Sequence, residues 1–271
     1  MLKVIYIWTL LSLATGLSAL SAGPLQTQEV PYQAGDQKMI GYLAMPQDVK
    51  AGSPAVLVVH EWWGQTDYPR KRAEMLARMG YIAFAVDMYG NRQITEHPKE
   101  AGAFSKAVFS DAKKVRSRFD AAYQALLDHS PAQAGKVAAI GYCFGGSVVL
   151  EVARQGAPLV AVASFHGGLI TPTQAQPGVK HPAVLVLHGG ADPMTSKAQI
   201  KQFKQEMESA QVAYQLKVYP GAKHGFTNPQ ATALGEKYGL AALGYQKKAD
   251  QASWSELEQF LKSVFKPLQG K

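Results

Sequence analysis

Three residues of the sequence have the types that covalent catalysis by a thiol requires. Cys143 is the only cysteine among the 271 residues, and Asp192 and His224 follow it along the chain. A thiol that attacks a carbonyl carbon needs a base to take its proton and an acid to orient that base. The sequence therefore predicts a nucleophile at Cys143, supported by His224 and Asp192.

The residues around Cys143 have the pattern of a sharp turn between a strand and a helix. In "GYCFGG" (residues 141–146) the cysteine follows an apolar run and precedes a predicted helix. Glycines let strand and helix approach closely at such a turn, and the helix N-terminus favours a thiolate and binds an oxyanion. A dinucleotide-binding G-x-G-x-x-G motif is excluded because residue 143 is not glycine. The alternative is a small buried thiol that packs a tight turn.

The elements that must position these residues alternate along the chain. Short apolar runs predict buried strands, and amphipathic stretches predict helices between them. The predicted strands cover residues 39–46, 55–60, 81–88, 136–142, 159–166, 181–189 and 214–220. The predicted helices cover residues 69–79, 99–128, 145–154, 196–209 and 252–265, the last capped by Ser253 or Ser255.

This alternation predicts an α/β fold, a mostly parallel sheet with helices on both faces, in one domain over residues 23–271. The ligand site of such a sheet lies at the carboxyl ends of its strands, where the three catalytic candidates also occur. His60, His166 and His188 follow strands too, but no metal-ligand spacing links them. We expect them to be structural, and we expect no metal and no cofactor.

Residues 1–22 have the three-part pattern of a secretory signal peptide. Lys3 precedes an apolar stretch, and small residues follow at Ala19, Ser21 and Ala22. Cleavage after Ser21 or Ala22 would give a periplasmic or secreted protein with no stable membrane insertion. The alternative is an uncleaved membrane anchor.

Composition narrows the classes of protein that fit. A hydrophobic content of 47% supports a large core, and a single cysteine excludes a disulfide framework. The net charge of +8 comes from scattered residues apart from a cluster at 113, 114, 116 and 118, which predicts a solvated helix face. Nucleic acid is excluded as a partner, because no aromatic residues alternate with these charges. The oligomeric state is not predicted.

Four motifs in order resemble the dienelactone hydrolase family, a branch of the α/β-hydrolases that uses cysteine in place of serine. They are "HEWWG" (60–64), "GYCFGG" (141–146), "GGADP" (189–193) and "KHGF" (223–226). The resemblance extends from about residue 30 to the C-terminal helix. It implies that Cys143 is the nucleophile, His224 the general base and Asp192 the residue that orients it.

The resemblance also assigns roles to residues beside the triad. The backbone amides of Trp62 and Phe144 are implied as the oxyanion hole. Glu61 is implied to contact the resting cysteine and to control when the thiolate forms, since a nearby carboxylate opposes a second negative charge. We further hypothesise that Glu61 keeps Cys143 protonated and so protects it from oxidation. The alternative for Glu61 is a loop cap or a salt bridge.

The match is weakest at the residues that would bind substrate. The family holds a carboxylate-bearing lactone with arginines; Arg92 is displaced by one position, and "HGFTNPQA" after the histidine contains none. Trp63, Tyr89 and Arg92 are candidates to contact the substrate, with packing as the alternative for the aromatic residues.

We therefore expect hydrolysis of a small-molecule ester or lactone through a thioester. A non-enzymatic binding protein on the same fold, or a thiol redox protein, are the alternatives. The redox alternative lacks a C-x-x-C motif and a resolving cysteine.

Overall fold

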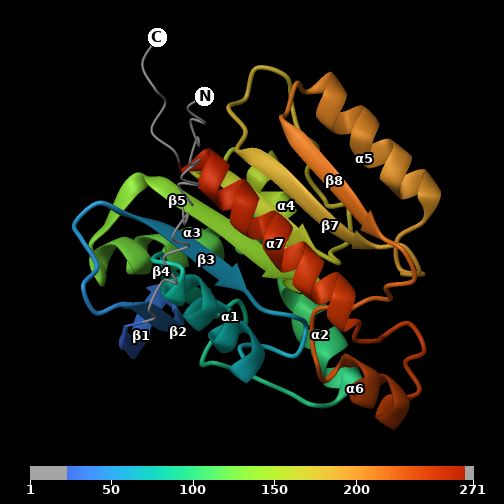
Figure 1. The fold of residues 1–271 in the computed structure, drawn as a ribbon, viewed down its shortest axis with the longest axis horizontal. Helices are drawn as coiled ribbons and strands as arrows, with labels where there is room; N and C mark the ends of the chain where they lie inside the picture. The colour runs from blue at the N-terminus through green and yellow to red at the C-terminus, as the bar shows by residue number, and fades with distance from the viewer. Residues whose placement is uncertain (1–22, 266–271) are drawn as a thin grey trace, which may run out of the picture.

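An eight-stranded sheet in the order β1-β2-β4-β3-β5-β6-β7-β8 forms the centre of the computed structural model, which describes residues 23–265 (Figure 1). The predicted signal peptide, 1–22, lies outside the described residues. The strands are β1 (Leu25–Ala34), β2 (Gln37–Pro46), β3 (Ser53–Val59), β4 (Ile82–Val86), β5 (Ala132–Tyr142), β6 (Ala161–Phe165), β7 (Ala183–Gly189) and β8 (Tyr214–Tyr219). The strand β2 pairs antiparallel with β1 and β4, and the other neighbours pair in parallel. The expected mostly parallel sheet is confirmed.

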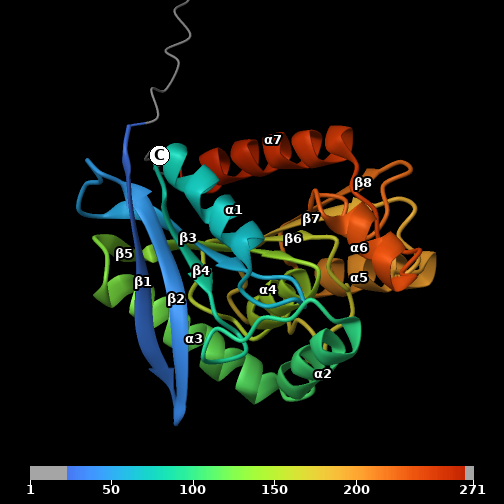
Figure 2. The same ribbon diagram turned by 90° about the horizontal axis from the view of Figure 1, so that it is seen from below.

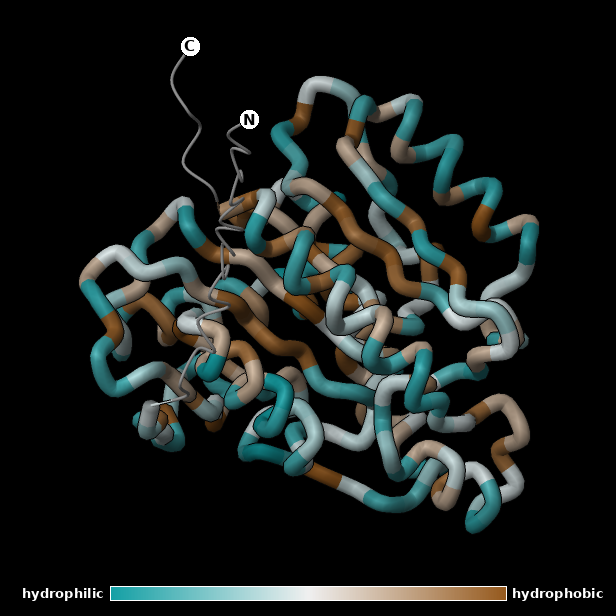
Figure 3. Tube along the Cα trace, viewed as in Figure 1, coloured by the Kyte–Doolittle hydropathy of each residue, from teal (hydrophilic) through white to brown (hydrophobic). Residues whose placement is uncertain are grey.

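Residues 23–265 contain seven helices, most of which cover the two faces of this sheet. They are α1 (Asp67–Arg78), α2 (Pro98–Phe109), α3 (Ala112–Asp128), α4 (Phe144–Arg154), α5 (Lys197–Ser209), α6 (Ala231–Tyr238) and α7 (Lys247–Val264). One apolar cluster joins the sheet to α1 and α7, and a second, larger one joins its other face to α3, α4 and α5 (Figure 2). Hydropathy follows this layering, with apolar central strands and polar outer helix faces (Figure 3). The central strands β4 and β6 are buried throughout, which is why they read as continuous apolar runs.

Four elements differ from the sequence prediction, the fourth being the last helix. The strand β1 was not predicted, because it lies at the sheet edge and exposes most of its polar side chains. The predicted helix over 99–128 is two helices, since Asp111 caps the second one by accepting the amides of Lys113 and Lys114. The short helix α6 was also not predicted.

The last helix begins five residues earlier than predicted, at Lys247. Ser253 is buried within this helix, and its hydroxyl donates to the carbonyl oxygen of Asp250, so it is not a cap. Within the described residues, no helix is long and apolar enough to cross a membrane.

The basic cluster on α3 is only partly the solvated face that the sequence predicted. Lys113 and Lys114 are exposed, but Arg118 is half-buried and donates to the carbonyl oxygens of Met88 and Tyr89 at 2.6 and 3.1 Å. Arg118 thereby attaches α3 to the loop after β4, which carries Tyr89 to the site described below.

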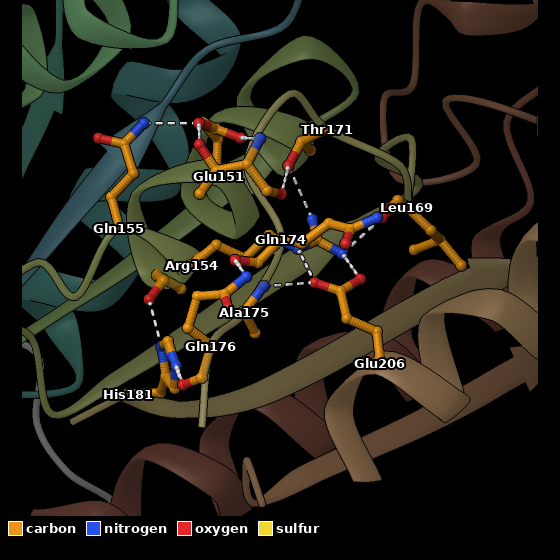
Figure 4. A network of polar contacts seen from close by, with 12 residues as sticks. Glu151, Arg154, Gln155, Leu169, Thr171, Gln174, Ala175, Gln176, His181 and Glu206 are labelled. Carbon is orange, nitrogen blue, oxygen red and sulfur yellow. Dashed lines mark hydrogen bonds and ion pairs between the residues drawn. The ribbon is translucent and has the colours of Figure 1, made fainter. Parts of the chain in front are cut away.

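A buried arginine holds the long connection between β6 and β7 (Figure 4). Arg154 of α4 forms two hydrogen bonds with the Glu206 carboxylate of α5, at 2.7 and 2.8 Å, and donates to Thr171 and to the Leu169 carbonyl. The Arg154 and Glu206 side chains are only 3% and 13% exposed. Two helices and one loop therefore depend on a single guanidinium.

We predict that Arg154→Met lowers the free energy of unfolding by about 3 kcal/mol, because it leaves the Glu206 carboxylate buried without its partner. The exposed pair Lys217–Glu256 provides the control, since Lys217→Met should cost less than about 1 kcal/mol. Urea denaturation measures both. Equal losses in the two variants would contradict the prediction.

Candidate active site

Cys143 lies at the turn between β5 and α4, in a backbone conformation that residues other than glycine rarely adopt. Its φ is 54° and its ψ is −115°. Holding a residue in such a region costs about 1–3 kcal/mol, and the surrounding contacts must supply this energy. The Cys143 amide donates to the Phe165 carbonyl at 3.0 Å and to Nδ1 of His166 at 3.1 Å. The thiol is half-buried, and the backbone of its turn is hydrogen-bonded to the neighbouring strand β6.

Two glycines of the motif are required by the closeness of the backbone at this turn. A Cβ atom on Gly145 would lie 2.3 Å from the Val59 carbonyl oxygen, and one on Gly141 would lie 2.0 Å from the Gly145 carbonyl oxygen. Either contact is a severe clash. The G-x-C-x-G pattern therefore has the physical cause that the sequence suggested.

Asp192 and His224 meet after β7 and β8. The Asp192 carboxylate is 2.8 Å from Nδ1 of His224, and both residues are buried. Burial alone would raise the pKa of Asp192, but the hydrogen bond and charge of His224 outweigh it and lower that pKa. Asp192 is therefore an anion that orients His224.

The other ring nitrogen of His224, Nε2, is buried and makes no hydrogen bond with a nitrogen or oxygen atom of residues 23–265. Burial lowers the pKa of His224, yet the charge and hydrogen bonding of the nearby Cys143 and the bond to Asp192 raise it to about 10. His224 thus retains a proton when Cys143 is a thiolate. This arrangement suits a base that first accepts a proton and later donates it.

Glu61, directly after β3, is buried and bonded to a neutral amide. Its Oε2 atom accepts a hydrogen bond from Nδ2 of Asn228 at 2.5 Å. Burial raises the pKa of Glu61 to about 7, although Asn228 and the charges of His224 and Arg72 oppose the rise. Sequence reasoning missed Asn228; its place four residues after His224, before a proline, was the available signal.

The two amides expected to form the oxyanion hole have free donors. Neither the Trp62 amide nor the Phe144 amide donates to another residue of the described chain. Tyr89 lies beside both residues: its hydroxyl donates to the Trp62 carbonyl at 3.0 Å, and its ring packs on Phe144. Burial and the charge of Cys143 raise the pKa of Tyr89, so the phenol remains neutral near the thiol.

The other two candidates for substrate contact are engaged elsewhere. Trp63 is 6% exposed and packs with Ala101 and Leu243. The Arg92 guanidinium pairs with Glu29 of β1 at 3.1 Å. The structure thus gives Trp63 a packing contact and Arg92 an ion pair, and a contact of either with substrate stays a prediction.

Two of the strand-end histidines hold loops through their ring nitrogens. His60 accepts the Met88 amide at Nε2 (3.2 Å) and lies 2.6 Å from the Glu61 carbonyl at Nδ1. His166 accepts the Cys143 amide. Within residues 23–265, no group of three or more His, Cys, Asp or Glu side chains has the arrangement of a metal site.

Comparison with known proteins places this site in a family. The model of the dienelactone hydrolase family matches residues 39–265. A solved dienelactone hydrolase-like promiscuous phosphotriesterase from metagenomic libraries is 32% identical, with a TM-score of 0.84 over 90% of this chain and 100% of its own.

Two curated relatives carry the names of lactone-cleaving enzymes. A Mus musculus protein named carboxymethylenebutenolidase homolog is 29% identical over 66% of this chain and 73% of its own length. A Bradyrhizobium protein named probable 2-oxo-3-(5-oxofuran-2-ylidene)propanoate lactonase is 28% identical over 70% of this chain and 79% of its own. The chain therefore belongs to the dienelactone hydrolase family and is an enzyme of the ester and lactone hydrolase class.

Proposed function

We propose that this protein hydrolyses a small ester or lactone through a thioester on Cys143. The Cys143 thiolate attacks the carbonyl carbon, and the Trp62 and Phe144 amides stabilise the resulting oxyanion. His224 gives its proton to the departing alkoxide, which leaves the acyl group on sulfur. His224 then takes a proton from water, and the hydroxide releases the acid and restores the thiolate.

The single observation that carries this proposal is the hydrogen bond between the Asp192 carboxylate and Nδ1 of His224, in a ring that also interacts with the Cys143 side chain. The strained backbone of Cys143 supports the same conclusion, since strain of this kind is concentrated at active sites.

We also propose that the reaction takes place outside the cytoplasm, after removal of the predicted signal peptide 1–22. The three-part pattern of those residues supports this location. N-terminal sequencing of the exported protein tests it, and a retained Met1 would contradict cleavage.

The charges near the thiol favour an acyl group without a negative charge. Three arginines around the strand ends have other partners: Arg92 pairs with Glu29, Arg72 pairs with Asp250, and Arg118 donates to backbone carbonyls. The buried carboxyl groups of Glu61 and Asp192 instead lie near His224. A carboxylate on the acyl chain would therefore lose its hydration without gaining an arginine partner.

We predict that Cys143→Ala reduces hydrolysis of p-nitrophenyl hexanoate by at least about 1000-fold, because no other thiol can accept the acyl group. Acid quenching of the wild type during turnover should leave a hexanoyl mass increment on the peptide that contains Cys143. Full activity of the alanine variant would contradict the mechanism, whatever the substrate.

We predict that kcat/KM is at least about tenfold (~1.4 kcal/mol) higher for p-nitrophenyl hexanoate than for mono-p-nitrophenyl adipate, the matched ester whose acyl chain ends in a carboxylate. Asn228→Lys should narrow this ratio by adding a cation near Glu61. Gln26→Lys, on the exposed edge strand β1, is the control and should not change it. Equal rates for the two esters would contradict a preference for neutral acyl groups.

The raised pKa of Glu61 predicts a dependence of stability on pH. The folded protein binds the Glu61 proton more tightly than the unfolded chain, so stability is full below about pH 4.5 and falls as pH rises to about 7. Relative to Glu61→Gln, the wild type should lose up to about 3 kcal/mol across this window. Urea denaturation from pH 4.5 to 8 measures the difference between the two proteins; a constant difference would show that the Glu61 pKa is not raised.

A further inference from the structure

His166 lies between the nucleophile turn and the loop that carries His224. It follows β6, is 1% exposed and has a φ of 41°. Histidine is among the residues that tolerate positive φ, but a buried ring in this conformation still requires specific contacts to hold it. The mechanism described above assigns it no role.

The hydrogen bonds of His166 determine which of its nitrogens carries the proton. Nδ1 lies 3.1 Å from the Cys143 amide, which can only donate, so Nδ1 must be the acceptor. The proton of the neutral ring is then on Nε2, which lies 2.8 Å from the Thr227 hydroxyl oxygen. The ring therefore connects the backbone of the nucleophile to the side chain of Thr227.

Thr227, three residues after His224, is itself fixed by α1. Its hydroxyl oxygen accepts from the Tyr68 hydroxyl at 2.7 Å, and its carbonyl oxygen accepts from Arg72 at 2.8 Å. Arg72 in turn pairs with Asp250 of α7. Thr227, the hydroxyl partner of His166, is thus bonded to α1 and, through Arg72, connected to α7. These two helices lie on the same face of the sheet.

His166 also contacts the catalytic base directly. Its ring meets that of His224 edge to face, with ring centroids 5.3 Å apart and an interplanar angle of 66°. One imidazole therefore borders both the residue that attacks and the residue that accepts the proton.

We propose that His166 is a positioning residue of the triad: as a neutral imidazole held by Thr227 it accepts the hydrogen bond of the Cys143 amide, and this bond to the nucleophile turn sets the separation between the thiol and His224. The proposal rests on the thiol mechanism proposed above. A shift of about 1 Å between reacting groups can cost about 100-fold in rate, so such a connection has a measurable effect.

The surroundings of His166 favour its neutral form. The titratable groups around its ring are His224 after β8, Arg72 of α1, His188 of β7 and the Tyr142 phenol of β5. Burial and the positive charges of His224 and Arg72 lower the pKa of His166. A protonated ring would turn a donor toward the Cys143 amide and repel His224 during catalysis.

Three substitutions separate the two hydrogen bonds of His166. His166→Asn places an oxygen near the Nδ1 position and tolerates positive φ; His166→Gln reaches the Nε2 position; His166→Phe keeps a ring without nitrogens. We expect His166→Asn to retain kcat for p-nitrophenyl hexanoate within about fivefold, because it preserves the bond to Cys143. We expect His166→Phe and His166→Gln to lose about 30- to 100-fold in kcat with KM changed less than threefold.

A second readout reports the triad without turnover. The rate of Cys143 alkylation by iodoacetamide between pH 5 and 9 should shift to higher pH in His166→Phe and stay close to wild type in His166→Asn. His181→Phe is the matched control: both ring nitrogens of His181 have partners too, the carbonyl oxygens of Ala153 and Gln176 at 3.0 Å, but the residue lies in the connection between β6 and β7, within the network around Arg154 (Figure 4). It should change neither readout.

Nitrogen NMR of the wild type tests the proposal without any variant. His166 should remain the neutral Nε2–H form from pH 5 to 8. Titration of His166 as an imidazolium in this range, or a wild-type kcat and alkylation profile in His166→Phe, would overturn the proposal. If the wild type formed no thioester, the proposed function would fail, whereas the NMR and alkylation results would still decide the role of His166.

Discussion

The backbone conformation of Cys143 is the constraint on which the site depends. A non-glycine residue at φ 54° persists only if its neighbours hold it there. Gly141 and Gly145 allow strand and helix to approach, and the amide of Cys143 is bonded to β6 through Phe165 and His166. The conformation that exposes the thiol is therefore stabilised by a strand other than the one that carries it.

The polar groups behind the thiol form a continuous sequence of contacts. Arg72 and Tyr68 hold Thr227, Thr227 meets His166, and His166 borders both Cys143 and His224. On the other side Asn228 holds Glu61. Because Thr227 and Asn228 are neighbours, one short segment after His224 positions both the Glu61 carboxyl group and the His166 imidazole.

The sequence predicted the sheet, and it selected Cys143, Asp192 and His224 as candidates, because these have local signals: buried apolar runs, a glycine pattern and residues at strand ends. It did not predict β1, whose polar edge lacks an apolar run, or the break at Asp111, where the apolar stripe continues across two helices. Nor did it predict the partners of Glu61 and His166, since Asn228 and Thr227 become significant only when distant loops meet. Contacts between residues far apart in the sequence depend on the fold, and the spacing of residues along the chain does not reveal them.

The strand order has a consequence for how the enzyme loses activity. The loops with Glu61, Cys143, His166, Asp192 and His224 follow β3, β5, β6, β7 and β8, which are five consecutive neighbours in the sheet. His224 follows the outermost of these strands, and β8 is an edge strand that pairs only with β7. Edge strands open at lower free energy than central ones. Detachment of β8 alone would displace His224, the proposed base, while the other strands stay folded, so inactivation can precede global unfolding, a difference that amide hydrogen exchange resolves.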